Sequence, residues 1–103
     1  MDINYIRNKF ANKEYLFTCH GDKERQNDNL LISELLDAIK NGIIIEHYED
    51  TGRGESCLVA GFNSEGKPIH IVLGMFGDSL VIITVYIPSP PKFKNIYERI
   101  KNE

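Results

Sequence analysis

The spacing of hydrophobic residues changes at Gly42, from a helical period before it to strand-like runs after it. Before this glycine, apolar residues recur at offsets of three and four. From Ile43 onward they form four apolar runs that are separated by turn residues. Helices followed by a series of strands are typical of an α+β domain, because parallel α/β folds alternate the two kinds of element. The pattern therefore predicts an α+β fold.

Two helices are indicated before Gly42. Asp2 is a predicted N-cap for a helix over residues 2–12, with a stripe formed by Ile3, Ile6 and Phe10. The second helix is expected to follow an N-cap at Asp28 or Asn29 and to close at Lys40, Asn41 and Gly42, with the stripe Ile32, Leu35, Leu36 and Ile39. The short aromatic segment 14–18 predicts an extended stretch leading to His20 and a polar segment after it.

The four later runs predict a curved four-stranded antiparallel sheet over residues 43–48, 56–62, 68–75 and 78–88. Short turns, NSEGK and FGD, suit hairpins, whereas EDTGRGE is a longer charged loop. Leu35, Leu36 and Ile39 are expected to pack on alternate strand residues, namely Ile71, Leu73, Ile83 and Val85. Ser89 is a predicted N-cap for a C-terminal helix with the stripe Phe93, Ile96, Tyr97 and Ile100.

Length and composition favour one domain over residues 1–103, with 42% hydrophobic and 26% charged residues. A formal net charge of -3 creates no general attraction to nucleic acid or anionic lipid. There is no apolar run of about 18 residues and no signal peptide, which predicts no membrane association and a cytoplasmic location. Cys19 and Cys57 are expected to be thiols in that compartment.

Proton-transfer chemistry near neutral pH points first to the histidines. His20 opens the polar segment, and His70 alternates with Ile69 and Ile71 in a strand. A solvated histidine and a buried, hydrogen-bonded histidine are the respective structural alternatives. His47 is expected at a solvated strand edge. Tyr86 ends the longest apolar strand, where its hydroxyl either reaches a cleft or is the wet tip of a boundary aromatic residue.

Basic residues follow His20 and occupy the predicted last helix. Lys23 and Arg25 lie just after His20, and Lys92 begins a series that first of all forms the solvent face of that helix. No cysteine or histidine pair has the spacing that places two metal ligands on one element. The sequence therefore predicts neither a metal site nor a cofactor site.

Three of these motifs together carry a family resemblance: His20 with a nearby arginine, Pro-Ile-His-Ile-Val over 68–72, and Thr-Val-Tyr-Ile-Pro over 84–88. Their order resembles a prokaryotic domain-of-unknown-function family of small proteins, which is similar to RelE and BrnT type toxins. The resemblance spans about residues 14–95. It implies a RelE or barnase type fold and a metal-independent endoribonuclease that cuts mRNA.

The chemistry of such an enzyme requires a base, an acid and a cation, and six residues are assigned to these roles. The assignment requires His20, Arg25, His70 and Tyr86 to meet on one surface. His20 and His70 would act as base or acid, and Tyr86 would hydrogen-bond the phosphate or the leaving group. The substrate-binding side chains would be Lys23, Arg25 and Lys92. His70 is expected to be partly exposed and within reach of Tyr86 on the neighbouring strand.

The alternative hypothesis is a non-catalytic RelE-like interaction domain that binds an antitoxin-type protein partner or assembles as a homodimer. The acidic balance and the isoleucine-rich run 43–45, expected at a sheet edge, favour this interpretation.

Overall fold

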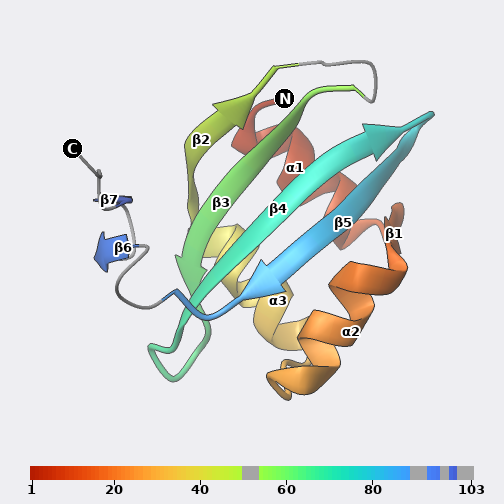
Figure 1. Ribbon diagram of the computed structural model, residues 1–103. Coiled ribbons are helices and arrows are strands. Elements are labelled where there is room, and N and C mark those ends of the chain that lie inside the picture. The colour runs from red at the N-terminus through yellow and green to blue at the C-terminus, as the bar shows by residue number, and fades with distance from the viewer. Residues whose placement is uncertain (50–53, 89–92, 96–97, 100–103) are drawn as a thin grey trace.

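A computed structural model describes residues 1–49, 54–88, 93–95 and 98–99. Within them the chain folds into three helices and a five-stranded mixed sheet (Figure 1). The predicted α+β class is confirmed. No helix among these residues has the length and apolar character needed to cross a membrane.

Two of the helices form over the predicted apolar stripes, although Ile32, the first residue of the second stripe, is 41% exposed. Helix α1 (Ile3–Ala11) begins after Asp2, whose side chain accepts a hydrogen bond from the Tyr5 N–H. Helix α3 (Ile32–Asn41) begins later than expected, because Asp28 instead ends the preceding helix. Leu35 and Ile39 are fully buried, whereas Leu36 is only partly buried against the core.

Helix α2 (Cys19–Asn27) forms in the polar segment where periodicity indicates no complete helix. The Thr18 hydroxyl caps it by accepting a hydrogen bond from the Gly21 N–H at 2.9 Å. Gly21 lets α2 approach the sheet closely, since a Cβ there would lie 2.6 Å from the Ile82 carbonyl oxygen. The helix therefore lies against strand β5 (Ser79–Tyr86).

The four predicted strands are present as an antiparallel meander: β2 (Ile43–Tyr48), β3 (Ser56–Phe62), β4 (Pro68–Phe76) and β5. A fifth strand, β1 (Tyr15–Phe17), pairs in parallel with β5, which gives the order β1-β5-β4-β3-β2. The prediction of a four-stranded, purely antiparallel sheet is therefore wrong. The sequence predicts the extended segment itself. It does not predict its partner strand β5, because β5 lies more than 60 residues later in the sequence.

The prediction of a C-terminal helix is also wrong for residues 93–95 and 98–99, which the structure describes. Two short antiparallel strands, β6 (Phe93–Asn95) and β7 (Glu98–Arg99), form there. Nucleating a short helix is unfavourable, and aromatic residues such as Phe93 also favour strands, so a short apolar stripe does not discriminate the two.

Helices α1 and α3 cover one face of the sheet, and the viewer of Figure 1 looks at the other face. Alternation sends Ile71 and Leu73 of β4 into the core beneath the helices. On β5 the core residues are Leu80, Ile82 and Val85. The expected Ile83 is not among them, because an irregularity in the β4–β5 register leaves it without a partner in β4. The sheet face away from the helices is called the outer face below.

Candidate active site

His70 and Tyr86 form a cross-strand pair on the outer face. They are register partners in β4 and β5, and His70 Nδ1 lies 3.3 Å from the Tyr86 hydroxyl oxygen, at hydrogen-bond distance. Their rings meet edge to face, with centroids 5.2 Å apart. The expected proximity of the two residues is confirmed.

The expected exposure of His70 is wrong, because its side chain is 0% exposed. Tyr86 flanks it on one side and Ala60 of β3, its other register partner, flanks it on the opposite side. A fully buried imidazole does not exchange protons with a substrate directly. Its contact instead holds the Tyr86 hydroxyl, which belongs to a partly buried side chain, in one orientation.

A second pair joins His20 and Glu24 on α2. The His20 side chain is 69% exposed, and its Nε2 lies 3.1 Å from Glu24 Oε1. The same carboxylate oxygen accepts the Val85 N–H at 3.3 Å, which ties α2 to β5. Glu24 was not among the predicted site residues, although its i,i+4 spacing from His20 is a readable signal for such a pair on a helix.

The two pairs approach β5 from opposite sides. Glu24 bonds Val85 on the α2 side, and Val85 directly precedes Tyr86, which contacts His70 on the β4 side. His20 lies on α2 and His70 on β4, so the two pairs come from elements on either side of β5.

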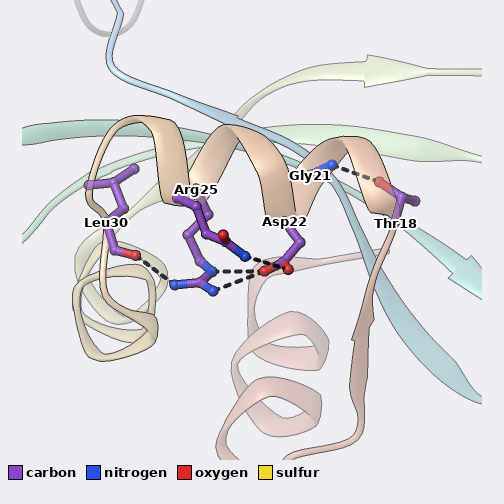
Figure 2. Close-up of polar contacts among 6 residues, drawn as sticks. Thr18, Gly21, Asp22, Arg25 and Leu30 are labelled. Atoms are coloured by element: carbon purple, nitrogen blue, oxygen red, sulfur yellow. Dashed lines mark hydrogen bonds and ion pairs between the residues drawn. The ribbon is translucent and has the colours of Figure 1, made fainter.

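Arg25 does not join either pair. Its guanidinium donates to Asp22 Oδ1, at 2.9 Å from Nη2 and 3.2 Å from Nε, and to the Leu30 carbonyl at 3.0 Å from Nη1 (Figure 2). It also lies 5.5 Å from the ring centre of Phe17, which packs against the core on the helix side. The guanidinium thus joins α2 to the segment before α3, on the opposite side of the sheet from His70 and Tyr86.

The remaining predicted residues, Lys23, Lys92 and His47, belong to neither histidine pair. Lys23 is exposed on α2, near His20 in sequence. Lys92 lies outside the described residues. His47 is exposed on the edge strand β2, as expected.

Cysteine, histidine and acidic side chains are the usual protein ligands of metal ions. Among the residues that the structure describes, no three His, Cys, Asp or Glu side chains gather closely enough to hold a metal ion. Cys19 is an exposed free thiol and Cys57 a buried one. Burial raises the pKa of the Cys57 thiol to about 11, so this sulfur is protonated and unreactive at neutral pH.

Comparison with known proteins identifies a family. The model of a family described as Domain of unknown function (DUF4258) matches residues 17–87. The matched span runs from the end of β1 to just past β5, and so contains both histidine pairs. No curated protein and no solved structure gives a significant match.

Proposed function

The chain belongs to the DUF4258 family, and from that premise we propose that it is a metal-independent endoribonuclease of the toxin type that its motifs resemble. The observation that supports this most is the exposed His20 imidazole, whose Nε2 lies 3.1 Å from the Glu24 carboxylate. A histidine oriented by a carboxylate is a recurring arrangement for a general base. The family description itself assigns no activity.

In the proposed reaction, His20 removes the proton from a ribose 2′-hydroxyl. With Nε2–H donated to Glu24, Nδ1 is the basic atom, and the carboxylate stabilises the imidazolium that forms. The 2′-oxygen attacks phosphorus, and the bond from phosphorus to the 5′-oxygen breaks. The leaving 5′-oxygen takes a proton from water, and the His20 imidazolium returns its proton to solvent. The products are a 2′,3′-cyclic phosphate and a 5′-hydroxyl.

Tyr86 is the proposed hydrogen-bond donor to the phosphate or to the leaving oxygen. His70 acts as a positioning residue, through its 3.3 Å contact with the Tyr86 hydroxyl. Lys23 is the proposed cation for the phosphate, because the Arg25 guanidinium is committed to Asp22 and Leu30. One lysine stabilises developing charge less well than an arginine cluster, so we expect slow turnover.

The direct test is cleavage of a defined single-stranded RNA in the presence of EDTA. We expect 2′,3′-cyclic phosphate and 5′-hydroxyl ends, and a rate that falls by about 10²–10⁴ in His20→Ala, the usual contribution of a general base. Glu24→Gln should lower the rate less. His47→Ala, which removes an exposed histidine on the distant strand β2, is the matched control and should leave the rate unchanged.

Two outcomes would reject the ribonuclease proposal. One is an RNA substrate that stays intact with the wild-type chain. The other is cleavage that His20→Ala does not reduce. Binding should also be weak, with a shallow salt dependence, because the net charge of -3 opposes phosphate approach.

The edge strand favours a second candidate, a non-catalytic interaction domain. Strand β2 ends the sheet, and Ile43 on it is 52% exposed. Edge strands pair readily with an added strand, here from an antitoxin-type protein or a second copy of the chain. Ile43→Lys should then abolish the complex seen by light scattering, whereas the ribonuclease proposal predicts no effect of this change on cleavage.

A further inference from the structure

A pocket of about 620 Å³ opens on the outer face, at the opposite end of the sheet from the His70–Tyr86 pair. The β4–β5 hairpin and the adjoining ends of β2 and β3 lie together at this end (Figure 1). Gly74 in the pocket lining follows His70 by four positions along β4, which corresponds to about 13 Å along a strand. The volume is within the range of about 300–1,000 Å³ that is usual for small-molecule sites.

The pocket exists because of a glycine and the irregularity in β5. Gly74 is the register partner of Val81 in β4, and because it is a glycine no side chain fills the space next to Val81. Ile83, the residue without a register partner, turns over Gly74, since a Cβ at Gly74 would meet Ile83 Cδ1 at 3.1 Å. Val81 and Ile83 thereby give the pocket an apolar floor.

Two aromatic rings form part of the pocket lining. They lie on β2 and β4, the strands on either side of β3. Phe76, where β4 turns into β5, is 77% exposed, and Tyr48, at the end of β2, is 37% exposed. Exposed aromatic side chains beside an apolar floor are costly in water and are typical of a surface that receives a flat ring.

The charged residues of the described lining are acidic. Glu49 and Glu55 border the pocket, and no lysine or arginine is found among the lining residues that the structure describes. Glu55 Oε1 is already paired with the α-ammonium group of Met1 at 2.8 Å, which leaves Glu49 as the carboxylate for a ligand. Carboxylates in this position repel phosphate esters and attract a protonated nitrogen.

We propose that this pocket binds a small aromatic amine, with its ring on Phe76 and Tyr48 and its protonated nitrogen at Glu49. The proposal is independent of the ribonuclease chemistry, since none of its residues belongs to either histidine pair. The domain would then bind a small molecule at a site separate from the one proposed for RNA.

Two probes with the same ring and opposite charge test the proposal by NMR titration. Tryptamine should shift the Val81 and Ile83 methyl signals in a saturable way, and indole-3-propionate should bind at least about tenfold more weakly, because the carboxylates repel it. Equal shifts with both probes, or no shifts with tryptamine, would overturn the proposal.

Variants identify the groups involved. Glu49→Gln should weaken tryptamine binding about fivefold or more, as expected for loss of a charge-assisted contact. Glu65→Gln, in the exposed β3–β4 turn, is the matched control and should bind like the wild type. Phe76→Ala tests the ring contact at a position whose exposure makes unfolding no concern. His20→Ala should keep full tryptamine binding, so failure of the pocket and failure of the ribonuclease proposal are distinguishable.

Discussion

The Cys57 thiol couples stability to pH at a single residue. Burial raises its pKa from 9.0 to about 11 in the folded chain. Between these values the unfolded state has lost the proton and the native state keeps it, so the free energy of unfolding falls as pH rises. We expect a loss on the order of 2 kcal/mol between pH 9 and 11, measured by urea unfolding at several pH values.

A comparison between cysteine variants isolates the contribution of Cys57. Cys57→Ala should be less stable than the wild type at pH 7 but should lose less stability between pH 9 and 11. Cys19→Ala removes an exposed thiol and should keep the wild-type slope. Parallel pH curves for Cys57→Ala and the wild type would contradict the prediction.

Among the elements, α3 is joined to the β3–β4 turn through Glu34. Its carboxylate accepts the Leu31 N–H at 2.9 Å and the Asn63 side-chain amide at 2.8 Å. These bonds lower the pKa of Glu34 below its usual 4.5, so their contribution is complete above pH 4.5 and is lost as pH falls through the lowered value. Glu34→Gln should cost about 0.5–1 kcal/mol at pH 7 and nothing in strong acid, by chemical denaturation. An equal cost for the exposed control Glu65→Gln would contradict this explanation.

Helix α3 also depends on Gly61 for its distance from β3. A Cβ at Gly61 would lie 2.0 Å from the Ala38 carbonyl oxygen, a backbone atom that cannot move without shifting the helix. Gly61→Ala should therefore destabilise the fold by about 1–3 kcal/mol, as overpacking does. Gly74→Ala should cost less, because its nearest contact is the flexible end of Ile83. A thermal unfolding series of the two variants decides between these outcomes.

At the scale of the whole molecule, one cluster of buried residues joins the helices to the sheet. Ile6 of α1 and Leu35 of α3 belong to the same cluster as Ile71 of β4 and Val85 of β5. We therefore expect one cooperative unfolding transition, with far-UV circular dichroism and tyrosine fluorescence superimposed. Ile6→Ala should shift both probes together and cost about 2–5 kcal/mol. Separate transitions would show that α1 unfolds independently.

The sequence by itself determined the elements whose signal is local. Strands β2 to β5 follow from apolar runs and turn residues, and α1 and α3 follow from apolar stripes that each helix buries. The meeting of His70 and Tyr86 follows from the same alternation, because both lie on one face of adjacent strands.

Only the tertiary structure decided the features that depend on distant partners. Helix α2 has no apolar stripe, and Gly21 is its one buried residue. Strand β1 pairs with residues 80–82, so its place in the sheet is set by contacts made after the rest of the chain has folded back. The burial of His70 and the direction of Arg25 depend likewise on neighbours from other elements. Side-chain periodicity specifies a face, whereas exposure and partners depend on what the fold brings against that face.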